Sequence, residues 1–214
     1  MNRRQLLASI LALCAFSTIS LAADTPWPAK PVRMIAPFPA GGATDTLGRF
    51  LGQRLGEKFG QPFILENRAG AAGNIGTNVV ATSAPDGYTL GLPSSGPLIT
   101  NKFIYKDMPY DPEKNLTPIA GMGEIPLVFV VNPSLPAKNL KEFIELARAN
   151  PGKYSMGNPG RGLPGHLTVE LMKMNNRIDL LSVSYKGDAP ALIDMLGGTI
   201  HSHCSPVTAF IANI

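Results

Sequence analysis

Residues 32–45 have the sequence VRMIAPFPAGGATD, and this stretch predicts the basic folding unit of the chain. A short apolar run breaks at Pro37 and is followed by the pair Gly41-Gly42. Leucines then recur every four positions over 47–55, and Gly60 comes after them. This order is typical of a strand, a glycine turn and an amphipathic helix that ends at a glycine.

A strand, a turn and a helix start in this order direct unpaired backbone N–H groups and the positive end of a helix dipole at one spot. Such a spot favours a small anion. A plain strand-to-helix turn without any ligand explains the same residues equally well. The stretch by itself therefore leaves both interpretations open.

The first 22 residues have the features of an export signal. Arg3 and Arg4 precede a mostly apolar run over 6–21, and small residues follow at 20–23. The run is short and interrupted by hydroxyl side chains, which favours a cleaved signal over a permanent membrane span. We therefore expect cleavage near residue 22 and a mature protein in the periplasm, exported by the general or the twin-arginine route.

Composition excludes some functional classes. The whole chain has 19 Lys+Arg against 15 Asp+Glu, and two of the arginines lie in the signal, so the remainder is nearly neutral. A nucleic-acid binder would carry a concentrated basic surface, so we expect no nucleic-acid partner. Cys204 is the single cysteine after the signal, so no intrachain disulfide is expected and stability must come from packing.

Strand and helix patterns alternate along the rest of the chain, which predicts an α/β protein. Asn74 is expected to cap a helix, and a composition break at 118–123 is the best candidate for a crossing between two domains. The expected strands are 62–66, 88–92, 127–131 (buried), 154–156 and 180–185, and the expected helices are 74–81, 140–149, one that begins at Pro164, and 189–196.

Six segments carry a resemblance to a known family. They are PWPAKPVRMIAPFPAGGATD from Pro26, GQPFILENRAGAAGNIG from Gly60, APDGYTLGL from Ala84, MPYDPEKNLTPIA from Met108, VFVVNPSLPAKNLKEFIELARANPGKYSMGNPGRGLPGHLTVEL from Val128, and SYKGDAPALIDMLGGTI from Ser184. In this order and spacing they resemble the tripartite tricarboxylate transporter receptors, the Bug family of periplasmic solute-binding proteins.

The resemblance implies a two-domain periplasmic-binding-protein fold of type II, with a ligand cleft between the domains. Residues 1–22 would be the signal, 23–120 the first domain and 121–214 the second. It implies a protein that captures a small carboxylate (a di- or tricarboxylate, an amino acid or an aromatic acid) and can deliver it to a two-component membrane permease, although many members have no adjacent permease. We expect the complete protein to be a monomer. The resemblance implies neither catalysis nor a cofactor.

The resemblance also implies which residues line the cleft. Asn158 stands where the family has a hydroxyl side chain, Arg161 could pair with a carboxylate or point to solvent, and Asp188 is an unexpected partner for an anion. The full set is Phe38, Pro39, Ala40, Gly41, Gly42, Asp45, Ser94, Ser95, Asn158, Gly160, Arg161, Gly162, His166, Asp188 and Ala189.

Two further motifs suggest other ligands. Residues 160–165 match the G-x-G-x-x-G dinucleotide fingerprint, but the following strand ends in Ser184-Tyr185 rather than in the acid that would bind a ribose. His201 and His203 lie on one face of an expected strand, as in a metal site, although Cys204 would then face the other side. We expect neither a dinucleotide nor a metal.

Two further functions use the same residues. Ser94 or Ser95 with His166 and Asp45 would supply the nucleophile, base and orienting acid of an exported hydrolase, but no G-x-S-x-G elbow is present. We expect His166 to hold its own loop instead. A ligand-sensing partner of a membrane receptor would use the same cleft as a transport receptor.

The family normally continues well beyond the point where this sequence stops, at Ile214. The absent part would return to the first domain and cover its sheet. We therefore expect a truncated copy or a fragment, weakly stable alone, with an apolar face and a sheet edge exposed. A reversible, cooperative thermal melt of a monomeric 23–214 chain would contradict this expectation.

Overall fold

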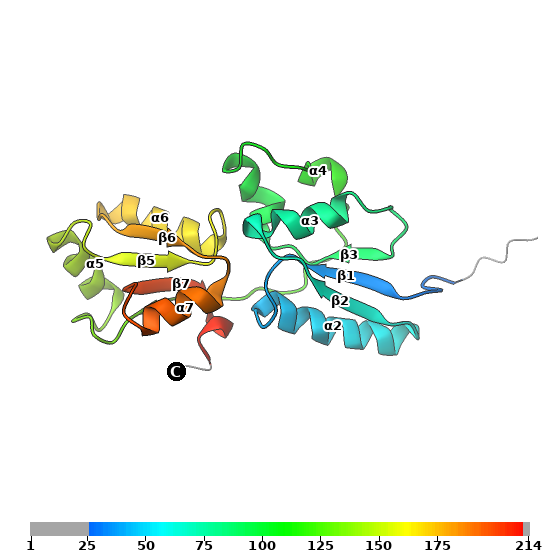
Figure 1. The fold of residues 1–214 in the computed structure, drawn as a ribbon, viewed down its shortest axis with the longest axis horizontal. Helices are drawn as coiled ribbons and strands as arrows, with labels where there is room; N and C mark the ends of the chain where they lie inside the picture. Colours follow the sequence, from blue (N-terminus) through cyan, green and yellow to red (C-terminus); the bar gives the residue numbers. More distant parts are fainter. Residues whose placement is uncertain (1–25, 212–214) are drawn as a thin grey trace, which may run out of the picture.

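The computed structural model describes residues 26–211, so the export signal predicted for residues 1–22 lies outside the described residues. Two separate sheets organise the chain (Figure 1). We call residues 26–115, which surround the first sheet, the first lobe, and residues 127–211, which surround the second sheet, the second lobe. The linking segment 116–126 has no helix or strand.

The first lobe is a parallel sheet in the order β2-β1-β3. β1 (Val32–Ala36) is central and almost entirely buried, because helices cover both faces of the sheet. β2 (Phe63–Asn67) and β3 (Thr89–Gly91) form the edges. α2 (Ala43–Phe59) packs on one face and α3 (Asn74–Ala81) on the other (Figure 1).

Short helical turns complete the first lobe. They are η1 (Ala71–Gly73), the π-helical turn η2 (Gly96–Thr100), η3 (Asn101–Phe103) and α4 (Pro112–Asn115). Asp111 caps α4, because its side chain accepts a hydrogen bond from the backbone N–H of Glu113.

The second lobe has a four-stranded sheet in the order β4-β7-β5-β6. β7 runs antiparallel to β4 and parallel to β5. The elements in chain order are β4 (Leu127–Val131), α5 (Leu140–Ala149), β5 (Ser155–Asn158), α6 (Pro164–Asn176), β6 (Leu181–Ser184), α7 (Asp188–Leu196), β7 (Ser202–Pro206) and η4 (Val207–Ala209).

Two apolar clusters hold the second sheet between its helices. The larger contains Phe143 of α5, Val169 of α6 and Met156 of β5, all almost fully buried. The other contains Ala191 and Met195 of α7. α5 and α6 therefore cover one face of the sheet and α7 covers the opposite face (Figure 1).

The predicted elements are confirmed with two corrections. The strand 127–131 is half-buried along its whole length rather than buried, because β4 is an edge strand. Asn74 does not cap α3, since the capping position is Gly73. The Asn74 side chain is instead buried, and its Oδ1 accepts hydrogen bonds from Asn101 Nδ2 at 2.6 Å and from the Tyr110 hydroxyl at 3.3 Å.

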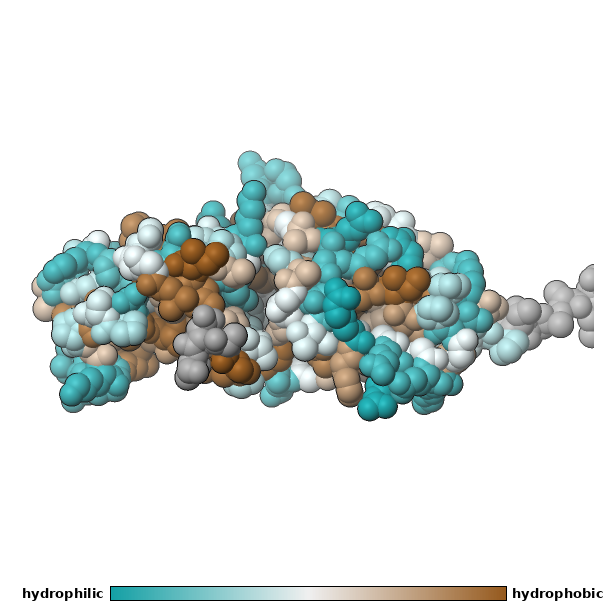
Figure 2. Space-filling view, turned by 60° about the horizontal axis from the view of Figure 1, so that its bottom comes forward, coloured by the Kyte–Doolittle hydropathy of each residue, from teal (hydrophilic) through white to brown (hydrophobic). Residues whose placement is uncertain are grey.

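Apolar side chains are exposed on both lobes (Figure 2). Phe50 and Ile64 are exposed on the first lobe, and Ile193 and Leu196 on the second. Among residues 26–211, no helix combines the length and the apolar character that a membrane crossing requires.

Glu66 gives the first lobe a pH-dependent contribution to stability. Arg33 Nε donates to its carboxylate at 2.9 Å and Arg68 Nη2 at 3.1 Å, and these hydrogen bonds lower the pKa of Glu66 from 4.5 to about 2. The contribution is therefore complete above pH 4.5 and is lost as the pH falls toward about 2. We expect Glu66→Gln to flatten the pH dependence of the urea unfolding midpoint over this range. Parallel curves for the two proteins would contradict this assignment.

Candidate ligand cleft between the lobes

The loops that follow parallel strands in both lobes meet at one place. The carboxyl ends of β1 and β5 point toward the junction of the lobes (Figure 1). In α/β proteins, ligands bind at the carboxyl ends of parallel strands. The space-filling surface is indented between the two lobes (Figure 2).

Direct contacts join these loops across the junction. Thr100 Oγ1 donates a hydrogen bond to the carbonyl of Gly162 at 2.8 Å, and the Tyr105 hydroxyl donates to the carbonyl of Arg161 at 3.1 Å. A Cβ placed on Gly187 would lie 3.0 Å from Cγ of Pro39. Predicted residues of each lobe therefore lie at contact distance from the other lobe.

The first wall is the start of α2. Gly41 has a left-handed φ of 82°, and its N–H donates to Asp45 Oδ2 at 3.0 Å. Arg49 donates to both carboxylate oxygens of Asp45, and this hydrogen bonding lowers the pKa of the buried Asp45 carboxyl. Asp45 thus stabilises the turn through its hydrogen bond to Gly41, and its charge is compensated by Arg49.

Backbone donors remain at the start of α2. The first amides of a helix have no acceptor within it, and the hydrogen bonds of the described residues give the N–H groups of Ala43 and Thr44 no backbone acceptor. The side chains of Pro39 and Ala40 are exposed, and Gly42 and Phe38 are half-buried. The glycine turn therefore presents main-chain groups rather than charged side chains.

A strained segment lies beside this wall, and the sequence analysis missed it. Gly70, Ala71, Ala72 and Gly73 all have positive φ, with Ala71 at 46° and Ala72 at 50°. A left-handed alanine costs about 1–2 kcal/mol. A Cβ on Gly160 of the second lobe would lie 3.4 Å from Cβ of Ala72, which places the strain at the junction. The paired glycines in GAAG are the signal that could have indicated this turn.

Ser94 and Ser95 follow β3 in the first lobe. The Ser94 Oγ is buried and has no hydrogen-bond partner among the described residues, whereas Ser95 is exposed immediately before η2. A buried hydroxyl without a partner is uncommon and calls for a function. The Oγ of Ser94, a predicted site residue, is therefore available for a further hydrogen bond.

Three residues of the second wall have different environments. Asn158 is buried, and its amide is used internally, since Oδ1 accepts from Gly160 N and Nδ2 donates to Ser182 Oγ. His166 Nδ1 accepts a hydrogen bond from Gly162 N at 3.4 Å, so His166 holds its own loop as expected. Burial lowers the pKa of His166. The Arg161 side chain is exposed.

The start of α7 completes the second wall. Asp188 Oδ1 lies 3.3 Å from His203 Nε2 and accepts a hydrogen bond from Ser205 Oγ, so this carboxylate is directed into its own lobe. Ala189 is exposed. The hydrogen bonds of the described residues leave the N–H groups of Asp188 and Ala189 without a backbone acceptor.

Two walls of main-chain donors at the strand ends are thus in place. Residues 47–214 match the model of a family described as tripartite tricarboxylate transporter family receptor. The chain belongs to this family.

Relatives and solved structures agree with this assignment. The chain is 39% identical over 217 residues to Protein BugT of Bordetella pertussis, covering 100% of this chain and 66% of BugT. Rpa4515 of R. palustris, solved with adipate, matches with a TM-score of 0.84 and 36% identity over 87% of this chain and 62% of that one. MatC of Rhodopseudomonas palustris, solved with bound malate, matches with a TM-score of 0.79 and 27% identity, covering 87% of this chain and 63% of that one. The chain thus spans less than two thirds of the length of these proteins.

The hydrolase interpretation finds no support in the hydrogen bonds of the candidate residues. Asp45 is paired with Arg49, and His166 with Gly162. Within residues 26–211, no hydrogen bond joins Ser94 or Ser95 to His166.

The other two motifs also have structural roles. Gly165 of the glycine-rich motif packs directly on the backbone carbonyl of Cys204. Burial raises the pKa of the Cys204 thiol to about 11. His201 Nδ1 lies 3.1 Å from the backbone N of Ser155, and the described residues hold no group of three or more potential metal ligands.

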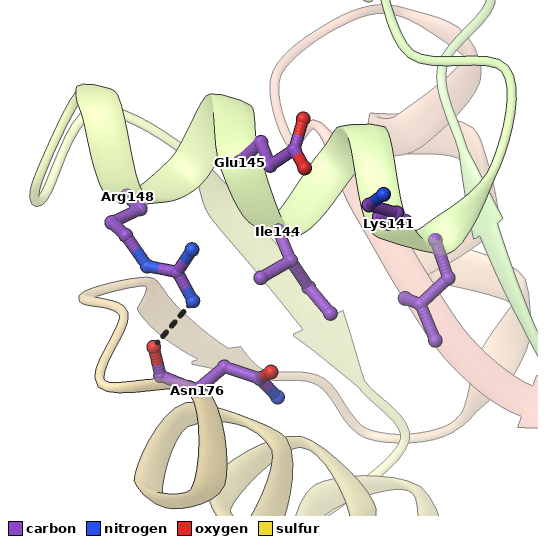
Figure 3. Close-up of a pocket in the computed structure, with 6 residues that line it drawn as sticks. Lys141, Ile144, Glu145, Arg148 and Asn176 are labelled. Carbon is purple, nitrogen blue, oxygen red and sulfur yellow. Dashed lines mark hydrogen bonds between the residues drawn. The ribbon is translucent and has the colours of Figure 1, made fainter.

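A separate cavity of about 350 Å³ lies on the flank of the second lobe (Figure 3). Arg148 of α5 reaches across it and donates a hydrogen bond to the carbonyl of Asn176, at the carboxyl end of α6. The predicted cleft residues of α6 lie at its opposite, amino end. The lining residues are Leu140, Lys141, Ile144, Glu145, Arg148 and Asn176.

Proposed function

We propose that this receptor captures a small dicarboxylate in the cleft between the lobes. Adipate and malate, found in two solved relatives, are both small dicarboxylates. The observation that carries the proposal is the pair of opposed walls, one at the start of α2 and one at the start of α7, each with backbone N–H groups that have no backbone acceptor among the described residues.

Main-chain donors are sufficient for useful affinity. An anion at a partly buried helix start gains up to about 2 kcal/mol, and each hydrogen bond to a charged group contributes about 1.5–3 kcal/mol. Micromolar binding requires about 8 kcal/mol. Four such amides, at Ala43, Thr44, Asp188 and Ala189, can reach that value when the lobes exclude water. Arg161 is therefore not needed as a direct partner.

The proposal includes the setting in which the receptor works. Residues 1–22 direct export to the periplasm, where the mature protein binds its ligand as a monomer. The two lobes correspond to domains at 23–120 and 121–214. The loaded receptor delivers its ligand to a two-component membrane permease, as the family description suggests.

A ligand screen by thermal shift tests the proposal. We expect adipate or malate to raise the melting temperature of the purified chain, because an anion that binds only the folded protein stabilises it. The uncharged adipamide and malamide are the matched controls and should give no shift. Equal shifts from acids and amides, or none from either acid, would reject a dicarboxylate site.

A further inference from the structure

His203 is a fully buried histidine behind the second wall. It lies on β7, paired with Gly157 of β5. Its Nδ1 is 2.8 Å from the carbonyl oxygen of Gly157, and its Nε2 is 3.3 Å from Asp188 Oδ1. Ser205 Oγ donates to the same oxygen of Asp188. A histidine, an aspartate and a serine thus form one connected cluster beneath the start of α7.

A hydrogen bond between His203 and Asp188 requires a second proton in this cluster. A carbonyl oxygen only accepts hydrogen bonds, so Nδ1 of His203 carries hydrogen. Nε2 then faces a carboxylate, and a hydrogen bond forms between them only if one more proton lies on Nε2 or on Asp188. With that proton the His203–Asp188 pair is neutral overall. Without it, two lone pairs oppose each other and the pair carries one negative charge.

Few other charges act on the pair. On the face of the sheet that α7 covers, β4 contributes the apolar Val130, and the Phe210 ring lies edge-on to His203 at 5.5 Å. Tyr185 donates its hydroxyl hydrogen to Asp194 of α7 at 2.7 Å, and burial together with this acid raises the pKa of Tyr185 to about 12.

The remaining ionisable neighbours are otherwise engaged. His201, two residues earlier on β7, contacts Ser155. Cys204 points to the opposite face of the sheet, into the cluster under α5 and α6. The ion pairs of the described residues give Asp188 no lysine or arginine partner. Among the described side chains, the shared proton is therefore the counter-charge of this carboxylate, beside the positive start of α7 on which Asp188 lies.

The pair is coupled to the cleft through one residue. Asp188 is the first residue of α7, and Gly187 immediately before it packs against Pro39 across the junction. Gly187 N also donates to the carbonyl of Pro159 at 3.1 Å. Any displacement of the Asp188 side chain would move the start of α7, and with it the second wall.

We propose that His203 is a positioning residue whose proton, shared with Asp188, fixes the start of α7 and keeps the second wall neutral, so that carboxylate capture depends on that proton. The inference rests on the proposed function, because it concerns the same cleft. Loss of the proton would place a negative charge behind the amides that hold an anion and would loosen the wall. Affinity therefore falls as the pH rises.

Calorimetric titration with adipate and malate at about pH 5.5 and about pH 8.5, which brackets the range where histidines exchange protons, tests this inference. We expect the affinity of the wild-type chain for each acid to fall at least tenfold as the pH rises from about 5.5 to about 8.5. In Asp188→Asn, the amide can donate to a neutral His203 without the extra proton, so the change should be less than twofold. His201→Gln is the matched control and should keep the wild-type dependence.

The outcomes separate this inference from the proposed function. Equal pH dependence in the wild type and Asp188→Asn, or a flat wild-type profile, would overturn the role of His203 while leaving dicarboxylate binding intact. Failure of both acids to bind at either pH would reject the proposed function. The inference about His203, which rests on that function, would be rejected with it.

Discussion

Replacing Gly187 by alanine is expected to weaken dicarboxylate binding by about tenfold or more, which corresponds to about 1.4 kcal/mol. Gly187 has φ 115° and ψ 179°, a region open almost only to glycine, and the new Cβ would lie 3.0 Å from Cγ of Pro39. The alanine therefore strains the start of α7 and separates the two walls that face each other. Titration of the variant with adipate and malate measures the loss.

Gly198→Ala is the control for Gly187→Ala. Gly198 also has a left-handed φ, 77°, and belongs to the same lobe, but a Cβ there would meet no atom within 4 Å. Both variants should lose stability through backbone strain, and the loss of affinity should be confined to Gly187→Ala. Equal affinities for the two variants would show that the contact with Pro39 does not matter for binding.

Gly76→Ala is expected to destabilise the first lobe by about 1–3 kcal/mol, the usual range for overpacking. A Cβ at Gly76 would lie 2.6 Å from the carbonyl oxygen of Arg68 and 2.7 Å from Cα of Pro37. Both neighbours are backbone atoms of the loops that follow β2 and β1, so they cannot move aside like a flexible side chain. Urea unfolding followed by circular dichroism measures the effect.

Gly56→Ala is the matched control in α2. Its Cβ would meet only the carbonyl oxygen of Gln61, at an ordinary contact distance of 3.5 Å. Since alanine is the better helix former, this variant should gain about 0.5–1 kcal/mol. Opposite signs are therefore expected for the same substitution in two helices. A gain in stability at Gly76 would contradict the close packing of α3 on the loops.

Elements with a strong local signal could be predicted from the sequence. α5 spans Leu140–Ala149 as expected, because its apolar positions repeat with the helical period and Asn139 caps its start. α2 ends at the left-handed Gly60 for the same kind of local reason. The half-buried state of β4 could not be predicted, because it depends on which strand lies at the edge of the sheet.

The loops of the cleft were also predictable, but the orientation of their side chains was not. The turn near Gly41 follows β1 and the turn near Gly160 follows β5, so each was predictable at the carboxyl end of a strand, and contacts between the lobes bring these two ends to the same junction. The buried Asn158 donates an amide hydrogen to Ser182, 24 positions away. Asn74 is held by Asn101 and Tyr110. Such long-range partners leave no local pattern in the sequence.

The two hydrogen bonds that close the lobes, from Thr100 and Tyr105, both end on main-chain oxygens of residues 161–162. A carbonyl is present whatever side chain the residue carries. Arg161 can therefore be replaced by other residues during divergence without loss of the hydrogen bond from Tyr105 to the backbone carbonyl of residue 161. The contact between the lobes is therefore independent of the side chain at position 161.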